Sequence, residues 1–207
     1  RDDSWVQFVE GLRADPEALD RLIPQTKTTA DRRLVDLYQL LSSRMRSRSR
    51  YSVESLAAVE PILGPVVTAK FGGALIAFAR QWTPVAPSER GPEAPDGFTS
   101  FDIMGLAGIS LEAATTPGWA EALDPDAARL AAVYALVELN GFPDYLGRLA
   151  AAQPEVVQAI LDAEVRAHIL AGRPDAHGIL DRLAYADVAL ARLVTPSLAG
   201  LLEGSER

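Results

Sequence analysis

Four arginines at alternate positions make the most chemically suggestive stretch of this sequence. Arg44, Arg46, Arg48 and Arg50 are separated only by Met and Ser residues. In an extended backbone alternate side chains share one side, so the four guanidinium groups would form a row able to follow phosphates. In a helix they would spread over two faces and repel one another. We therefore keep two interpretations, an anion or nucleic-acid contact and, as the favoured one, a solvated connection between helices.

Two pairs of titratable residues also have spacings that chemistry could use. Asp102 and Glu112 are ten residues apart in a predicted helix, hence roughly 15 Å apart, whereas glycoside hydrolysis needs carboxylates about 5–10 Å apart. We expect them on a solvent-facing helix edge, not in a catalytic pair. Glu164 and His168 lie one helical turn apart and would supply two metal ligands. Two ligands do not make a site, so we predict a hydrogen-bonded or surface pair and no metal.

Other catalytic and cofactor motifs are missing from the sequence. There is no Cys, no Gly-x-Ser-x-Gly nucleophile elbow and no phosphate-binding Gly-x-x-x-x-Gly-Lys-Ser/Thr loop. Gly72-Gly73 lies inside a predicted helix, where two small residues either allow a neighbouring helix to approach closely or mark a break. We expect Trp82, Trp119 and Tyr134 in the core. The sequence therefore predicts no catalytic residue, no cofactor and a chain that is non-catalytic by itself.

Charge is distributed unevenly along the chain. The net charge is −8 over 207 residues. Residues 1–82 hold 12 Lys/Arg against 10 Asp/Glu, whereas residues 98–207 hold 7 against 15. Phosphate contacts need cations, so the acidic half disfavours nucleic acid as a partner. The longest apolar stretch, 65–79, contains Lys70 and is too short to cross a bilayer. We predict no membrane partner and a cytoplasmic location.

Hydrophobic periodicity predicts helices along nearly the whole chain. The segments 98–115 and 127–139 are apolar nearly all round, which indicates burial between other helices. We also expect a helix over 52–60, a short helix that stops near Pro24, and a last short helix that starts at Pro196.

A proline-rich stretch suggests the domain organisation. Residues 83–97 hold four prolines and two glycines, which prevent regular structure. The prediction is an N-terminal helical half (1–82), a Pro-rich linker or surface loop (83–97) and a C-terminal helical-repeat half (98–207). Because the chain begins with Arg1 and not Met, we expect it to be part of a longer protein.

The predicted helices are separated by a recurring turn, X-Pro-acid. It occurs at Asp15-Pro16-Glu17, Asp124-Pro125-Asp126, Gln153-Pro154-Glu155 and Arg173-Pro174-Asp175. With this punctuation the chain resembles the HEAT and armadillo class of α-solenoid, over residues 98–200 and more loosely over 1–82. The intervals of 29 residues (Pro125 to Pro154) and 20 residues (Pro154 to Pro174) are shorter than the roughly 40–47 of regular repeats. The expected fold is all-α, with stacked antiparallel helix pairs or, alternatively, an irregular helical bundle.

The resemblance also implies a function. One segment, residues 138–145, is similar to helical repeat regions of large multidomain bacterial proteins, including NTPase-type sensors. Its sequence is Glu-Leu-Asn-Gly-Phe-Pro-Asp-Tyr. It implies a protein–protein interaction or scaffold module, whose partner is another protein or the flanking domains of the same chain. Nucleic-acid or anion binding through Arg44–Arg50 is the alternative. An enzyme with a site between the two halves is the third hypothesis.

Overall fold

The chain is all-helical in the part that its computed structural model describes, residues 2–26, 32–45, 50–91, 97–171 and 178–205. Those ranges contain no strand, which confirms the all-α class. The elements in chain order are α1 (Asp2–Ala14), α2 (Ala18–Thr26), α3 (Arg33–Met45), α4 (Glu60–Leu63), α5 (Pro65–Gln81), the 3-10 helix η1 (Pro87–Glu89), α6 (Ser100–Thr115), α7 (Trp119–Ala122), α8 (Pro125–Ala135), α9 (Tyr145–Ala152), α10 (Pro154–Ala171), α11 (Ile179–Ala184) and α12 (Val188–Ser205). Within these ranges no helix has the length and apolarity needed to span a membrane.

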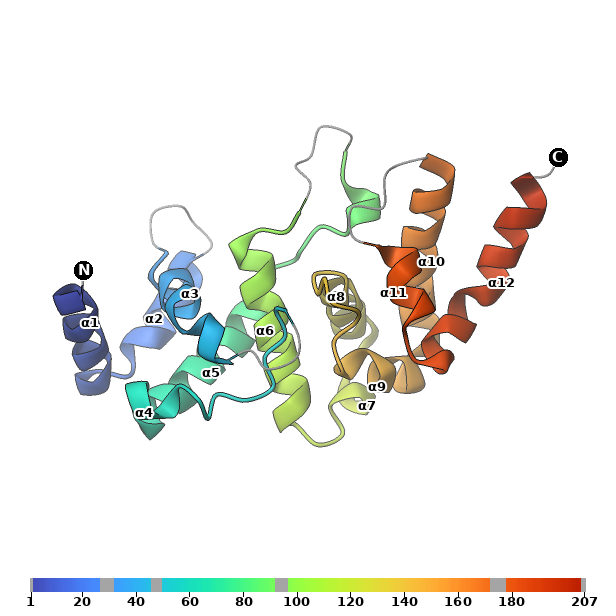
Figure 1. Cartoon of the computed structure of the whole chain (residues 1–207). Helices are drawn as coiled ribbons and strands as arrows, with labels where there is room; N and C mark the ends of the chain where they lie inside the picture. Colours follow the sequence, from blue (N-terminus) through green and yellow to red (C-terminus); the bar gives the residue numbers. More distant parts are fainter. Residues whose placement is uncertain (1, 27–31, 46–49, 92–96, 172–177, 206–207) are drawn as a thin grey trace.

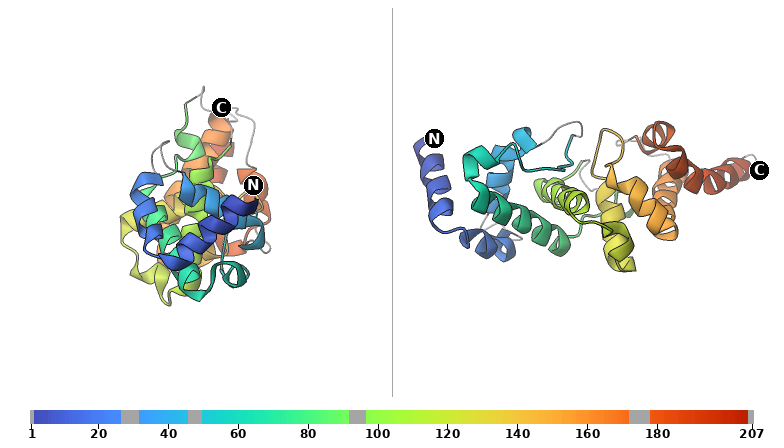
Figure 2. Two further views of the ribbon diagram at one scale, coloured as in Figure 1. Left: turned by 90° about the vertical axis from the view of Figure 1, so that its left-hand side faces the viewer. Right: turned by 90° about the horizontal axis from the view of Figure 1, so that it is seen from below.

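The helices follow one another along a long axis, with the two termini at opposite ends (Figures 1 and 2). Going along this axis, α5 packs on α6, α6 on α8, α8 on α10 and α10 on α12. Helix lengths range from 4 residues in α4 to 18 in α10 and do not by themselves reveal a repeated unit. The stacked-pair, HEAT-like arrangement therefore stays a prediction.

Helix α6 is the central element of this row. It is buried between α5 and α8, as its nearly uniform apolar sequence predicted. Glycines allow the close packing, because a Cβ on Gly108 would overlap the carbonyl of Leu75 in α5. A Cβ on Gly105 would overlap the ring of Tyr134 in α8. Of the pair Gly72-Gly73, only Gly72 shows the predicted close approach: a Cβ on it would meet the side chains of Leu56 and, in α6, Leu111, whereas Gly73 has open space around it.

The hydrophobic core consists of two clusters that meet at α6. One cluster gathers residues of α1–α5 and also takes Met104, Ala107 and Leu111 from α6. The other takes Leu106 and Ile109 from α6 and continues through α8–α12. The division falls near the predicted boundary, but α6 belongs to both clusters. That 1–82 and 98–207 are separate domains remains a prediction.

Part of the proline-rich stretch is packed and not free. Pro84 and Ala86 are buried, and η1 contacts α10. Residues 92–96 of the predicted linker or loop lie outside the described residues.

Four helix predictions were wrong. Residues 51–59 do not form a helix, because the backbone N–H groups at the start of this segment bind the side chain of Glu138. Pro24 and Pro196 both lie inside helices, α2 and α12. The predicted helix over 127–139 ends earlier, at Ala135. In α12 the residue after the proline, Ser197, donates to Asp162 of α10 at 2.7 Å, and this tertiary contact favours continuing the helix past Pro196.

Candidate functional site

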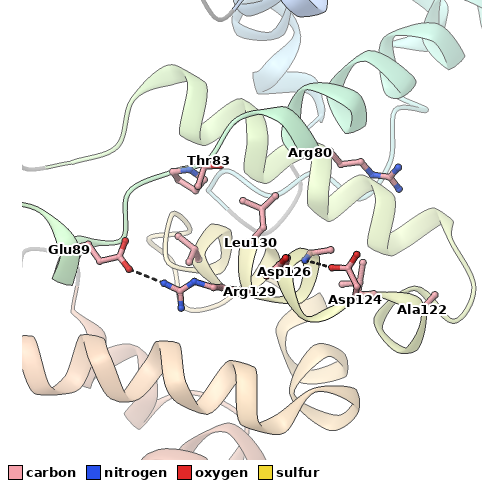
Figure 3. Close-up of a pocket in the computed structure, with 12 residues that line it drawn as sticks. Arg80, Thr83, Glu89, Ala122, Asp124, Asp126, Arg129 and Leu130 are labelled. Atoms are coloured by element: carbon pink, nitrogen blue, oxygen red, sulfur yellow. Dashed lines mark hydrogen bonds and ion pairs between the residues drawn. The ribbon is translucent and has the colours of Figure 1, made fainter.

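An open groove of about 640 Å³ lies where the first half of the chain meets the second (Figure 3). One wall is the end of α5 with the segment that leads to η1, and the other wall is α7 with α8. It is lined by Arg80, Thr83, Pro84, Glu89, Ala122, Leu123, Asp124, Asp126, Ala127, Arg129, Leu130 and Val133. The groove is thus apolar at its base and charged at its rim.

The first wall is a proline-rich segment fixed by side chains from other elements. The backbone N–H of Ser88 donates to both carboxylate oxygens of Glu164 in α10, at 3.1 and 3.2 Å. Glu89 forms an ion pair of 2.9 Å with Arg129 of α8, which bridges the two walls. The guanidinium of Arg90 donates to the carbonyl of Val85 at 3.2 Å. These contacts hold a proline-rich segment that, contrary to the prediction of no regular structure for 83–97, contains the short 3-10 helix η1.

The second wall begins at one of the predicted X-Pro-acid turns. Asp124 is the N-cap of α8, and its carboxylate accepts from the backbone N–H of Ala127 at 2.8 Å. Pro125 occupies the first helical position, where its missing N–H costs nothing. Leu130 and Val133 follow on the face that forms the base of the groove.

The charges of the groove are only partly compensated. Arg80 pairs with Glu112, and Arg129 pairs with Glu89. Asp126, exposed in the first turn of α8, has no hydrogen-bond or ion-pair partner among the described residues. Both lining arginines are therefore neutralised, while the rim retains uncompensated negative charge.

The predicted solvent-facing edge of Asp102 and Glu112 was wrong, because both side chains are buried, with 5% and 6% of their surface exposed. Glu112 is covered by the guanidinium of Arg80. Asp102 forms a capping box with Thr99 and also accepts from Trp82 Nε1 at 2.8 Å. Each carboxylate has a partner on a neighbouring element, so neither needs solvent.

Tyr134 of α8 forms hydrogen bonds to the end of α5, where the first wall of the groove starts. The hydroxyl of Tyr134 donates to the carbonyls of Trp82 (2.8 Å) and Ala79 (3.2 Å). Burial, together with the negative charge of Asp102, raises the pKa of this phenol far above its usual value, so it remains a donor. Tyr134 and Trp119 are buried as predicted, whereas Trp82 is half-buried.

The arginine stretch is only partly described. Arg44 lies exposed in the last turn of α3, and Arg46 and Arg48 lie outside the described residues. Arg50 is exposed, and its backbone N–H donates to Glu138. Only two of the four arginines, Arg44 and Arg50, are therefore described, and the anion or nucleic-acid interpretation stays a prediction.

Glu138 is a fully buried carboxylate that forms no ion pair with any described residue. Its oxygens accept six hydrogen bonds, from the backbone N–H groups of Arg50 (3.0 Å), Tyr51 (2.9 Å), Ser52 (2.9 Å), Leu139 (3.1 Å) and Asn140 (3.2 Å) and from the Ser52 hydroxyl (3.0 Å). Burial alone would raise the pKa of this carboxyl, but the hydrogen bonds outweigh it and hold the pKa below its usual value. Glu138 thereby ties residues 50–52 to the end of α8.

A buried cation holds the other side of the same chain turn. Arg182 of α11 donates to the carbonyls of Ala135 (2.8 Å), Leu136 (3.1 Å) and Gly141 (2.9 Å), and its guanidinium stacks on Phe142. A cation suits this place because the C-terminal carbonyls of α8 carry partial negative charge. Residues 135–142 are thus fixed by an acid and a base that each bind mainly backbone.

Glu164 and His168 do not bond to each other. The Glu164 carboxylate is buried and binds Ser88, and its pKa is raised by burial and by the negative charge of Glu89, against the hydrogen bonds from Ser88. His168 is half-buried on the same helix. Across the described part of the chain no three His, Cys, Asp or Glu side chains gather in a way that could hold a metal ion.

Fold and groove together define an all-helical chain with a mixed-charge groove between its halves. Comparison with protein-family models, with curated proteins and with solved structures found no match to this chain. The lining residues of the groove were not predicted from the sequence, in which they are up to 53 positions apart, from Arg80 to Val133. Only the Asp124-Pro125-Asp126 turn pointed to one of its walls.

Proposed function

We propose that this chain is a protein-interaction module, non-catalytic by itself, which binds an extended basic segment of a partner protein in the groove between η1 and α8. The observation that carries the proposal is the rim: its two arginines are already paired, and Asp126 is exposed and uncompensated. A Lys or Arg of the partner placed at this rim would supply the missing positive charge, while an adjacent apolar side chain would lie on Leu130 and Val133.

Two further features support a protein partner. The walls are fixed by the Glu89–Arg129 and Ser88–Glu164 contacts, so little ordering free energy is lost on binding. The negative charge of residues 98–207 repels phosphates, which disfavours nucleic acid at this groove. The resemblance to helical-repeat scaffolds and the predicted cytoplasmic location are consistent with such a module but rest on the sequence alone.

The test is selection of peptides from a random displayed library, followed by affinity measurements on the winners. We expect Lys or Arg next to an apolar residue to be enriched, and the affinity to fall as salt rises. Asp126→Lys should weaken binding by about tenfold or more, since it puts like charge against the peptide. Asp181→Lys is the matched control, because Asp181 is also an exposed acid in the first turn of a helix, α11, away from the groove.

Two results would overturn the proposal. One is a selection that yields no basic consensus. The other is equal peptide affinity in wild type and Asp126→Lys, with Asp181→Lys unchanged as well. Salt-sensitive self-association through the arginine stretch of a second copy would appear as oligomers in sedimentation, and it would assign the groove to a different occupant.

A further inference from the structure

A second, smaller cavity lies where three separate segments meet. It has a volume of about 190 Å³ and shares no residue with the groove. Its walls come from the segment after Arg50, from the second half of α6 and from the start of α9: Ser52, Glu54, Ser110, Ala114, Pro143, Asp144, Tyr145 and Arg148. Neighbouring Glu138 fixes the first wall through residues 50–52.

One buried hydroxyl of this cavity has nothing to bind. Ser110 is 3% exposed, and its Oγ has no hydrogen-bond partner in the described structure. The other two hydroxyls of the cavity are used, because Ser52 donates to Glu138 and Tyr145 donates to the carbonyl of Ala131. Buried polar groups are nearly always hydrogen-bonded. The Ser110 hydroxyl therefore points to a polar partner that enters from the cavity.

Two charged residues of the cavity, Asp144 and Arg148, are exposed to solvent and make few contacts within the protein. Asp144 and Arg148 are one helical turn apart at the start of α9, a spacing at which acid and base commonly form an ion pair. No ion pair joins these two side chains, although both are described. One nitrogen of Arg148 donates to the carbonyl of Ala113 at 3.0 Å, and the Asp144 carboxylate caps no backbone N–H. The Asp144 carboxylate and the remaining nitrogens of Arg148 are thus exposed and available to a ligand.

We propose that this cavity binds a small zwitterion of the free α-amino-acid type. Its ammonium group would bind the carboxylate of Asp144, and its carboxylate would bind the guanidinium of Arg148 and the hydroxyl of Ser110. A simple anion would lie against Asp144 and Glu54, and a simple cation would lie against Arg148, so a single charge fits less well. The volume is below the roughly 300–1,000 Å³ of sites for drug-sized ligands, which restricts the occupant to a compact molecule.

The experiment is an NMR titration of the ¹⁵N-labelled chain with each common L-amino acid, and with acetate and methylammonium as the two halves of the ligand. At least one amino acid should give saturable shifts confined to residues 52–54, 110–114 and 143–148. Acetate and methylammonium should bind at least about tenfold more weakly, since each lacks one charged hydrogen-bonding group. Arg148→Gln and Asp144→Asn should each weaken binding by about tenfold or more on the same basis.

Two controls separate binding from folding. Arg166→Gln removes an exposed arginine of α10 that does not line the cavity, and it should leave the affinity unchanged. Ser110→Ala should fold normally and reduce only the affinity, by roughly three- to tenfold for a neutral hydrogen bond. The proposal is overturned if no amino acid gives saturable shifts, if acetate binds as tightly as the amino acids, or if Arg148→Gln leaves the affinity unchanged while its fold is intact.

Discussion

Replacing the buried carboxylate Glu138 by its neutral isostere tests how the two halves of the chain are joined. Glu138→Gln keeps the size of the side chain but turns one acceptor oxygen into an NH₂ donor. Whichever oxygen is lost, three donors lose their acceptor, and two or three of them are backbone N–H groups of residues 50–52 or 139–140. We expect residues 50–52 to detach from the end of α8 in the variant.

The magnitude follows from the number of donors. A buried donor left without an acceptor costs about 1–3 kcal/mol, and some relaxation is expected because Ser52 has a hydroxyl that can rotate. We therefore expect the free energy of unfolding to fall by about 3 kcal/mol. For a chain of this size that corresponds to a melting temperature lower by about 6–12 °C.

Glu164→Gln is the matched control, since Glu164 is also a buried carboxylate bound by backbone N–H but has its pKa shifted in the opposite direction. Gln can still accept from Ser88, and the burial of a charge is avoided. We expect Glu164→Gln to be as stable as wild type, or more stable, at pH 7. Urea unfolding followed by circular dichroism measures both variants.

The pH dependence gives a second readout. The pKa of Glu138 is lowered in the folded state, so its contribution is present above the unfolded value of about 4.5 and is lost as pH falls through the folded pKa. The pKa of Glu164 is raised, so the wild type loses stability relative to Glu164→Gln as pH rises above about 4.5. A Glu138→Gln variant within about 0.5 kcal/mol of wild type at pH 7 would refute this reasoning, because that is the range of surface substitutions.

Other positions test the packing and the buried polar contacts. Gly108→Ala should destabilise by about 2 kcal/mol or more in urea unfolding, because its Cβ would overlap the carbonyl of Leu75, whereas Gly73→Ala in open space should stabilise by about 0.5–1 kcal/mol; equal effects would contradict the close packing of α6. Arg182→Met should lower the unfolding free energy by about 3 kcal/mol, since three carbonyls lose their donor, and an unchanged melting temperature would contradict its anchoring role. Tyr134→Phe should cost about 1–2 kcal/mol in thermal unfolding, and a neutral result would mean that its two hydrogen bonds contribute nothing net.

Local sequence signals were enough to predict the helical class and the burial of α6 between other helices. The 3.6-residue period reports which face is buried, and an apolar stretch without a polar face, such as 98–115, must have neighbours all round. Prolines misled where tertiary contacts decide the outcome: α12 runs through Pro196 while its next residue is bound to Asp162 of α10.

The buried charges were not predictable from local pattern. Glu112 was placed on a solvent-facing helix edge, and Glu164 in a hydrogen-bonded or surface pair with His168, whereas both are buried against other partners. Their partners are 32 and 76 residues away, at Arg80 and Ser88. The groove could not be predicted for the same reason, because its two walls come from different helices that are far apart in the sequence. An X-Pro-acid turn predicts where a helix starts, but it does not predict which other elements that helix contacts.

The hydrogen bonds between Glu138 and residues 50–52 also affect how the chain folds during its synthesis on the ribosome. Its partners are up to 88 residues apart in the chain. A ribosome adds about 5–20 residues per second, so the segment after Arg50 waits about 4–18 s before Glu138 has been made. During that interval the core of α1–α5 also lacks Met104, Ala107 and Leu111 for most of the time. The nascent first half therefore emerges with an apolar face of α5 uncovered, and we expect it to need α6 and α8 from the second half before it becomes resistant to proteolysis.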